Sequence, residues 1–590
     1  MNTSELLLEV QDLRVGFGLV DAHGRPRNVE AVGRGTQGVS FAVPANTTVA
    51  LVGESGSGKS VTAMAIVRLL PRNAHCEGRV AWRGEDLLRA SNARMQQLRG
   101  HEIACVFQDP MSSLNPVLSI GQQVAEPLVK HLGLARRAAR RRAEELLAEV
   151  GIAEPRRRLD CHPHELSGGQ QQRVMIAMAL ACEPRLLIAD EPTTALDVTI
   201  QRQILDLLAR LQAQRGLSML FISHDLGLVG EVAREVVVLR RGTVREHGPV
   251  QQIFDAPRDP YTKALLACRP RLEGRPHRLT VIEDLLPEPA TAEAAGAAVP
   301  RPAPSAASEE ARGHDDPVIL QVDHLSKSFW IRTGVFWRRE FRAVHDVRFA
   351  LRRGHTIGVV GESGSGKTTM GLTLLRLHDA STGPLAGRVL FHGHDLLSLA
   401  PADRLAMRRR IQIVFQNPYA ALNPRFTIAQ TLLEPMNIHH IGATLHERER
   451  RARDWLARVG LDADAMQRYP HEFSGGQRQR IAIARSLTLS PDVLVLDEAV
   501  SALDVSVQAQ VLNLLKDLQD ELGLAYVFIS HDLAVVRYMA DEVLVMKDGR
   551  VLEHRSTEAL LEQPQDDYTR RLIGAVPRGR AAQPAAAGAA

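Results

Sequence analysis

The sequence predicts an α/β protein that consists of two tandem copies of one domain. Three motifs occur twice in the same order: GESGSGK at Gly53–Lys59 and Gly361–Lys367, SGGQ at Ser167–Gln170 and Ser474–Gln477, and ISHDL around His224 and His531. The copies are 308 residues apart at the first motif and 307 apart at the other two. Because the spacing changes by a single residue, we infer that a whole domain is duplicated.

Composition indicates where each copy ends. We expect a first domain at 5–272, a linker at 273–316, a second domain at 317–576 and a tail at 577–590. From about Pro287 to Pro317 the chain is dominated by Ala, Pro and Glu and has few large apolar residues. We therefore predict that the second part of the linker is flexible to semi-extended, and that the tail AAQPAAAGAA is disordered.

Bulk properties exclude several classes of function. Hydrophobic residues make up 45% and charged residues 24% of the chain, and the net charge of +4 is too small for a dedicated nucleic-acid binder. The arginines at 136–142 indicate a solvated helix face. Five scattered cysteines favour neither disulfides nor a zinc or iron–sulfur site. The start of the chain lacks a signal-peptide pattern, and no apolar run approaches the ~20 residues that span a bilayer.

The first motif predicts a phosphate-binding loop. In both copies an apolar strand runs through the Gly-rich turn into a helix, the context that makes G-x-x-x-x-G-K-[ST] informative. Backbone N–H groups of the loop and the helix N-terminus would bind phosphates. Lys59 and Lys367 would reach the β- and γ-phosphates, while Ser60 and Thr368 would ligate Mg²⁺.

Two acidic residues follow a later apolar strand in each copy. RLLIADE ends in Asp190-Glu191, and DVLVLDE ends in Asp497-Glu498. Buried parallel strands deliver such groups at their carboxyl ends, so the first acid suits the Mg²⁺ shell and the second suits activation of water. The weaker alternative is that these acids cap the helix that follows.

Further motifs are LSGGQ and FSGGQ, the histidines His224 and His531, the glutamines Gln108 and Gln416, and the ALD segments at 195–197 and 502–504. With these and the motifs above, the chain resembles the ATP-binding-cassette ATPases over nearly its full length. The resemblance implies two RecA-like nucleotide-binding domains, each with an antiparallel β subdomain and an α-helical subdomain. It also implies that the SGGQ signature of each cassette closes head to tail over the P-loop nucleotide of the other. Since both motif sets are intact, we expect two hydrolytic sites.

The resemblance assigns the candidate residues to three roles. The catalytic residues would be Glu191, His224, Glu498 and His531. The Mg²⁺ ligands would be Ser60, Gln108, Asp190, Thr368, Gln416 and Asp497. The ATP-binding residues would be Phe17, Gly53, Glu54, Ser55, Gly56, Ser57, Gly58, Lys59, Ser60, Val61, Gln108, Ser167, Gly168, Gly169, Gln170, Phe329, Gly361, Glu362, Ser363, Gly364, Ser365, Gly366, Lys367, Thr368, Thr369, Gln416, Ser474, Gly475, Gly476 and Gln477. Phe17 and Phe329 would stack on adenine, with packing in the core as the competing interpretation.

Further segments resemble the oligopeptide/dipeptide/nickel importer branch, including the fused double-ATPase subunits of glutathione- and microcin C-type systems. These segments are DPMSSLNP and NPYAALNP after the glutamines, HPHELSGG and YPHEFSGG at the signatures, and DPYTKALL and DDYTRRLI near each domain end. The resemblance implies a peripheral ATPase at the cytoplasmic face of the bacterial inner membrane. Its partners would be two transmembrane permease subunits and, indirectly, an extracytoplasmic solute-binding protein. Peptide is the leading cargo, with nickel or another solute as alternatives.

The main rival is a ribosome-associated translation factor of the ABC-F type. Such proteins are also soluble twin cassettes, but their inter-domain segment is long, charged and helical, whereas this one is short and rich in Ala and Pro. A DNA-repair cassette protein would need zinc-ligand cysteines in CxxC pairs, which this sequence lacks. We therefore expect an importer ATPase that binds no nucleic acid.

Overall fold

The structure is a computed structural model of the chain. It describes residues 5–20, 26–194, 196–286, 317–332, 338–378 and 380–577. The Ala/Pro/Glu-rich part of the expected linker, at 287–316, and most of the expected tail, from 578 onward, lie outside the described residues. Contacts divide the chain into two compact units. The first contains 1–196 and 200–267, and the second contains 197–199 and 268–576.

A mainly parallel sheet forms the centre of the first unit. Its strand order is β11-β10-β4-β9-β8-β7, with only β11 antiparallel to its neighbour. The strands are β4 (Thr48–Val52), β7 (Ile103–Val106), β8 (Leu186–Asp190), β9 (Ser218–Ser223), β10 (Glu235–Arg240) and β11 (Thr243–Pro249). Every residue of β4, β8 and β9 is buried, as expected for strands that are covered on both faces.

A smaller antiparallel sheet lies beside it in the first unit. Its order is β2-β1-β5-β6, and β3 also pairs with β1. The strands are β1 (Leu6–Val20), β2 (Pro26–Val32), β3 (Val39–Pro44), β5 (Ala74–Trp82) and β6 (Glu85–Asp86). In β3 the buried residues alternate with less buried ones, the pattern of a sheet with one face on the core.

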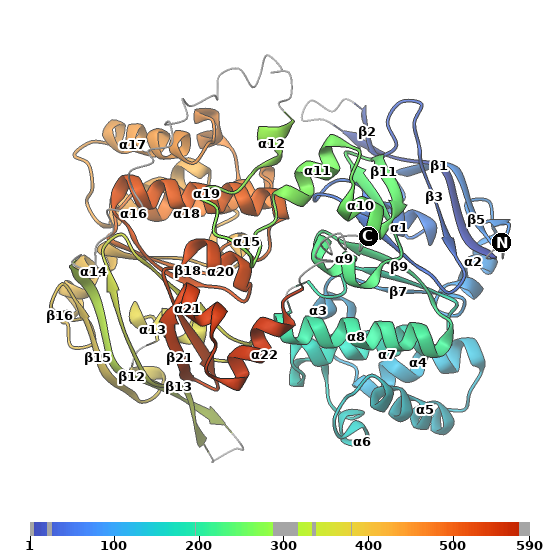
Figure 1. The fold of residues 1–590 in the computed structure, drawn as a ribbon, viewed down its shortest axis with the longest axis horizontal. Helices are drawn as coiled ribbons and strands as arrows, with labels where there is room; N and C mark the ends of the chain where they lie inside the picture. Colours follow the sequence, from blue (N-terminus) through green and yellow to red (C-terminus); the bar gives the residue numbers. More distant parts are fainter. Residues whose placement is uncertain are drawn as a thin grey trace, which may run out of the picture. The chain divides into compact units, whose positions relative to one another are not determined.

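The helices of the first unit include a group in which α4, α5 and α7 pack together, set apart from β1, β2 and β5 in Figure 1. Helix α5 explains the arginine cluster, since its buried residues are alanines and leucines and its arginines lie on the opposite face. The helices are α1 (Lys59–Ile66), α2 (Asn92–Leu98), α3 (Pro110–Ser113), α4 (Ile120–Leu132), α5 (Arg136–Glu149), α6 (Pro155–Arg158), α7 (Gly168–Leu180), α8 (Val198–Arg215), α9 (Leu226–Val232), α10 (Val250–Asp255) and α11 (Pro260–Ala267).

The second unit repeats this plan. Its main sheet has the order β17-β18-β19-β14-β20-β21, and its antiparallel sheet has the order β13-β12-β15-β16. The main strands are β14 (Thr356–Val360), β17 (Ile411–Val414), β18 (Val493–Asp497), β19 (Ala525–Ile529), β20 (Glu542–Lys547) and β21 (Arg550–Ser556). The antiparallel strands are β12 (Val318–Arg332), β13 (Arg338–Arg352), β15 (Leu385–Phe391) and β16 (His394–Asp395).

The helices of the second unit correspond to those of the first, preceded by a short extra helix, α12 (Ile282–Leu285). Within this unit α16, α17 and α18 pack together, apart from β12, β13 and β15 (Figure 1). The helices are α13 (Lys367–Leu374), α14 (Pro401–Arg410), α15 (Pro418–Ala421), α16 (Ile428–Ile438), α17 (Leu445–Arg458), α18 (Gly475–Leu487), α19 (Val505–Leu522), α20 (Leu533–Met539), α21 (Thr557–Glu562) and α22 (Asp567–Ala575).

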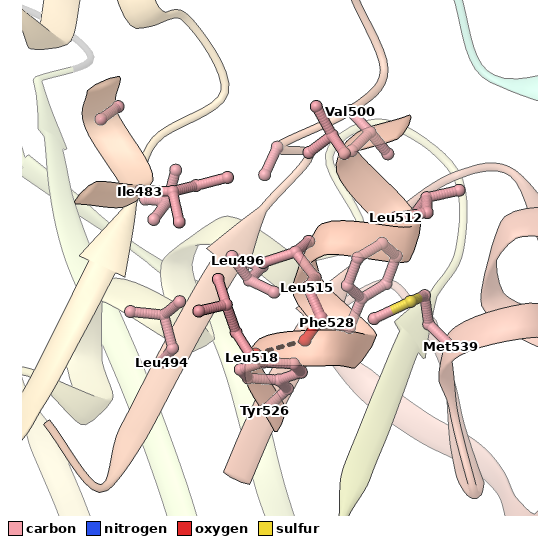
Figure 2. Packing of buried hydrophobic residues seen from close by; sticks show 14 of the residues in the cluster. Ile483, Leu494, Leu496, Val500, Leu512, Leu515, Leu518, Tyr526, Phe528 and Met539 are labelled. Carbon is pink, nitrogen blue, oxygen red and sulfur yellow. Dashed lines mark hydrogen bonds between the residues drawn. The ribbon is translucent and has the colours of Figure 1, made fainter. Parts of the chain in front are cut away.

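Figure 2 shows the core between the main sheet and helix α19 in the second unit. Leu496 from β18 and Phe528 from β19 pack with Leu515 from the helix, and all three are fully buried. The Tyr526 hydroxyl donates to the Leu515 carbonyl at 2.8 Å, so the one polar atom of this ring is paired. The core thus fixes the strand whose carboxyl end carries Asp497.

The predicted fold class is confirmed: two α/β domains in tandem, each with an antiparallel sheet and a helical group. Among the described residues, no helix combines the length and apolar character needed to cross a bilayer.

Candidate active site

Glycine is required at the start of each P-loop. Gly53 follows β4 with φ +149°, and a Cβ there would lie 2.1 Å from the Leu239 carbonyl oxygen. Gly361 follows β14 with φ +150°, and its Cβ would lie 2.1 Å from the Met546 carbonyl oxygen. Any other residue would push the loop away from the neighbouring strand. The repeated glycines therefore set the path of the backbone that surrounds the expected phosphates.

Each P-loop ends at a helix N-terminus that no side chain caps. Helices α1 and α13 begin at Lys59 and Lys367, after glycines in the left-handed conformation. Each lysine curls back over the loop, with Nζ 2.7 Å from the carbonyl oxygen of Gly53 or Gly361. Burial lowers the pKa of Lys367, although nearby carboxylates oppose the shift. Open helix N–H groups beside a lysine suit an anionic ligand.

A hydroxyl and a carboxylate meet below each loop. Ser60 Oγ donates to Asp190 at 3.0 Å, and Thr368 Oγ1 donates to Asp497 at 3.0 Å. Burial, together with the adjacent glutamate, raises the pKa of Asp190 and raises that of Asp497 to about 6. Two hard oxygen donors at a buried point fit Mg²⁺, whose charge would stabilise the ionised acid.

Each P-loop also contains a buried serine hydroxyl, at one of the positions expected to bind ATP. Ser57 is 3% exposed and Ser365 is 5% exposed. Neither Oγ has a hydrogen-bond partner within the parts of the chain that the structure describes. A polar atom left unsatisfied in the same place in both loops fits a site built for a ligand.

The second acid of each pair has unusual backbone geometry. Glu191 and Glu498 both have φ +48°, the left-handed region that glutamate rarely adopts. Their N–H groups donate to Ile222 and Ile529 at 2.9 Å, so the conformation is held by the adjacent strand. Strain of this kind concentrates at functional sites, where the surrounding structure imposes it.

The predicted glutamine and histidine both contact the Glu191 carboxylate. Gln108 Nε2 donates to it at 2.8 Å, Thr194 Oγ1 donates at 2.9 Å, and His224 Nδ1 lies 3.1 Å away. Burial opposes ionisation, but His224, Thr194 and Lys59 outweigh it and lower the pKa of Glu191 to about 2. This carboxylate is therefore ionised at neutral pH.

The second cassette repeats this cluster. Gln416 Nε2 donates to Glu498 at 2.7 Å, and His531 Nδ1 lies 3.5 Å from the same carboxylate. Burial opposes each shift, but the pairing lowers the pKa of Glu498 and raises the pKa of His531. The structure thus brings together five predicted groups in each copy: lysine, aspartate, glutamate, histidine and the glutamine that donates to the glutamate.

The signatures lie at helix N-termini, as their sequence indicates. Ser167 caps α7 and Ser474 caps α18, each in a reciprocal capping box with the glutamine three residues on. In the second, Gln477 N donates to Ser474 Oγ at 3.3 Å while Ser474 N donates to Gln477 Oε1 at 3.0 Å. The glycines between them leave the first turn open to a ligand.

The two candidate adenine-stacking rings are half-buried. Phe17 packs against the core of the first unit. Phe329 meets the His378 ring edge to face at 5.1 Å, and Lys327 lies 4.9 Å from its centroid. Adenine stacking stays a prediction at both positions. Ala195, in the first ALD segment, lies outside the described residues.

One residue that contacts the P-loop in each cassette was not among the candidates from the sequence. The tyrosines of DPYTKALL and DDYTRRLI are buried, and each accepts a hydrogen bond from the second residue of its P-loop. Glu362 N donates to Tyr568 Oη at 3.0 Å, and Glu54 N donates to Tyr261 Oη at 3.3 Å. We call Tyr261 and Tyr568 the P-loop tyrosines. Their occurrence at the same place in both cassettes, within DPYTKALL and DDYTRRLI, is the sequence feature that could have indicated them.

A buried glutamate holds the segment that carries the first P-loop tyrosine. Glu246 accepts from Arg258 N at 2.8 Å and from Asp259 N at 3.0 Å. Asp259 in turn accepts from Tyr261 N at 2.8 Å and so begins helix α11. Burial opposes the shift, but these N–H groups and the Thr262 hydroxyl lower the pKa of Glu246. The carboxylate is thus a structural acceptor for this turn.

Comparison with known proteins identifies related chains. A family model described as "ABC transporter" matches residues 36–194 and 344–501. A second, described as the C-terminal region of oligopeptide/dipeptide transporters, matches residues 245–296, which include the first P-loop tyrosine.

The similarity to individual proteins extends over nearly the whole chain. The peptidoglycan transport ATP-binding protein YejF of Agrobacterium fabrum is 45% identical over 573 residues, which cover 96% of each chain. The glutathione import ATP-binding protein GsiA of Salmonella typhimurium is 45% identical over 586 residues, or 97% of this chain and 89% of that protein. GsiA of Escherichia coli O1:K1 is 44% identical over 587 residues, with the same coverage.

Proposed function

Because this chain belongs to the ABC transporter family and is an ATPase of that family, we propose that it energises the import of peptides, including glutathione-like ones, with two hydrolytic sites. The observation that carries the proposal is the duplicated cluster of lysine, aspartate, glutamate and histidine below two intact P-loops.

At each site the chain's own residues supply binding and activation. The backbone of the P-loop and its lysine would bind the phosphates of ATP. Ser60 and Asp190, or Thr368 and Asp497, would hold Mg²⁺, which supplies charge neutralisation when bound. Glu191, ionised at neutral pH, is a carboxylate able to orient a water molecule and accept its proton. His224 would keep that carboxylate in place.

We propose that Gln108 and Gln416 connect the site to a partner. Each amide donates to the carboxylate of Glu191 or Glu498, and an exposed segment follows it directly. Met111 and Val117 are 77% and 76% exposed, and Tyr419 is 64% exposed. Met111 and Tyr419 stand at the same place after the two glutamines, and these exposed side chains support a protein partner, which for an importer is a pair of permease subunits.

The remaining parts of the proposal follow from family likeness. Each signature would complete the P-loop site of the other cassette, Ser474–Gln477 for the first and Ser167–Gln170 for the second. Permease binding would hold the chain at the cytoplasmic face of the inner membrane, with a solute-binding protein delivering cargo outside. Peptide cargo is supported by the match at 245–296 and by the names of the relatives.

The catalytic assignment is tested with Glu191→Gln and Glu498→Gln in the full chain. Each change removes one proton acceptor with little change in shape, so each should reduce steady-state ATP hydrolysis. The double variant should nearly abolish it, and full activity in the double variant would contradict the assignment.

The transport role is tested by isolating the chain with its membrane partners. Mass spectrometry should identify permease subunits and a peptide on the partner binding protein. Recovery of nickel in place of peptide would replace the proposed cargo, and co-sedimentation with ribosomes would overturn the importer role.

A further inference from the structure

The segment Leu272–Leu286, which we call the strap, precedes the second cassette in sequence yet belongs to it in structure. It lies in the second unit, where Leu279, Val281 and Ile282 are 4%, 7% and 3% exposed. Leu279 and Val281 are part of the same apolar core as helices α19 and α20. Burial of three apolar side chains indicates a docked element.

Polar contacts fix the register of the strap on α19. Asn513, which is 2% exposed, donates from Nδ2 to the Leu279 carbonyl at 2.8 Å and accepts from Leu279 N at 3.0 Å. The same side-chain oxygen accepts from the Tyr538 hydroxyl at 2.8 Å. A single asparagine thus satisfies both backbone groups of one strap residue, as a neighbouring β-strand would.

The strap is also connected, through Asp541, to the strand that leads into the second P-loop. Arg275 pairs with Asp541 at 3.1 Å and lies 3.5 Å from Glu558. Asp541 uses its other oxygen to accept from Thr356 N, the first residue of β14, at 2.9 Å. One carboxylate therefore connects the strap to β14.

Helix α20 lies between the strap and the main sheet. It begins at Leu533, two residues after His531, with Asp532 as its cap, and it carries Arg537, which donates to the Leu272 carbonyl. Its other side packs tightly on β14, since a Cβ added to Gly358 would lie 2.7 Å from Val536. A helix fixed on both sides cannot shift without moving the strap or the sheet.

The corresponding face of the first cassette has different chemistry. Where the second cassette has Asn513, Tyr538, Asp541 and Glu558, the first has Asp206, Glu231, Arg234 and Gln251. Arg202 pairs there with Asp206 at 3.0 Å and with Glu231 at 2.8 Å. Arg234 and Gln251 line an open hollow of about 620 Å³. An arginine in the place of Asp541 would repel a strap that carries Arg275.

We propose that the strap is an internal ligand of the second cassette alone, and that it positions α20, and through it His531, for hydrolysis at the P-loop of that cassette. The positioning part rests on the proposed role of His531. The docking part rests on the contacts of the strap and is tested separately.

Docking is tested by trypsin cleavage of the full chain after Arg278. Asn513→Asp removes the donor to the Leu279 carbonyl and places a carboxylate oxygen beside it. The strap should open more often, so cleavage at this bond should become about tenfold faster. The matched control is Asp206→Asn, the reverse exchange at the equivalent position of the first cassette, which should leave the rate unchanged. Equal cleavage of the Asn513→Asp variant and the parent would overturn docking through Asn513.

Positioning is tested by ATP hydrolysis in a Glu191→Gln background, where turnover reports the second P-loop site. Asn513→Asp should lower kcat several-fold with little change in KM, because binding groups are untouched. Faster cleavage with unchanged kcat would refute the positioning role. If Asn513→Asp fails to fold, Arg275→Gln, at a side chain that is 23% exposed, carries both measurements in the same direction. If the Glu191→Gln, Glu498→Gln double variant stays active, the proposed catalytic roles fail while the cleavage test still decides docking.

Discussion

Replacing Tyr568 with Phe tests whether the P-loop tyrosine maintains the loop for nucleotide binding. The change deletes one hydroxyl and leaves the ring, which is 5% exposed, in place. Glu362 N then loses its acceptor at 3.0 Å. One hydrogen bond contributes about 0.5–1.5 kcal/mol net. The free energy that favours the binding conformation of the loop should therefore fall by this amount. At about 1.4 kcal/mol per tenfold, ATP affinity should fall by roughly 2- to 12-fold.

The assay is ATP titration of the full chain in a Lys59→Ala background, so that binding reports the second P-loop. The matched control is Tyr526→Phe, which also deletes a buried hydroxyl with a 2.8 Å hydrogen bond, but one made to Leu515. That variant should lose a similar amount of stability and keep its affinity. If Tyr568→Phe is as stable as Tyr526→Phe and binds ATP as tightly as the parent chain, Tyr568 does not maintain the loop for nucleotide binding.

Three further changes have expected outcomes. Gly361→Ala should abolish ATP binding by the second P-loop, because its Cβ would lie 2.1 Å from a carbonyl oxygen. Gly364→Ala is the control, since a Cβ there meets nothing within 4 Å. It should lower the stability of the loop only by backbone strain of about 1–2 kcal/mol. Glu246→Gln should destabilise the chain to urea at pH 7, and the difference in free energy of unfolding should shrink as the pH falls below 4.5. A carboxyl whose pKa is lowered on folding contributes fully above its unfolded pKa and loses that contribution as the pH falls through its folded pKa. A difference that stays constant with pH would contradict this. Leu515→Ala should lower the free energy of unfolding in urea by about 2–5 kcal/mol. A decrease below about 1 kcal/mol would show that neighbouring side chains repack into the cavity.

The sequence predicted the fold and which side chains lie together at each site, for a physical reason, while the catalytic roles of those side chains stay predictions. The P-loop, the strand-end acids and the signature are local patterns, and their roles depend on backbone geometry that a few residues determine. Lys59 and Asp190 are far apart in sequence, yet Lys59 lies in the loop-to-helix segment after β4 and Asp190 ends β8. Parallel strands bring their carboxyl ends to one edge of the sheet, which places the two residues together.

What the sequence did not predict depends on contacts between distant segments. Tyr261 reaches Glu54 across 207 residues, and Leu279 reaches Asn513 across 234 residues. Apart from Leu272, the strap falls within the expected linker at 273–316, although its apolar residues distinguish it from the Ala/Pro-rich stretch that follows. Gln108 was expected to ligate Mg²⁺, which stays a prediction, and the structure adds that its amide donates to Glu191.

Docking of the strap has a consequence for how the two halves meet. Only Cys268–Arg271 separates helix α11 of the first unit from the strap. The two cassettes are therefore joined by a short connection, and short linkers give the linked parts an effective concentration in the millimolar range. We expect specific ATPase activity to stay constant on dilution of the intact chain. If the chain were cut within 287–316, the strap would become an intermolecular contact, and activity would fall as the two fragments are diluted.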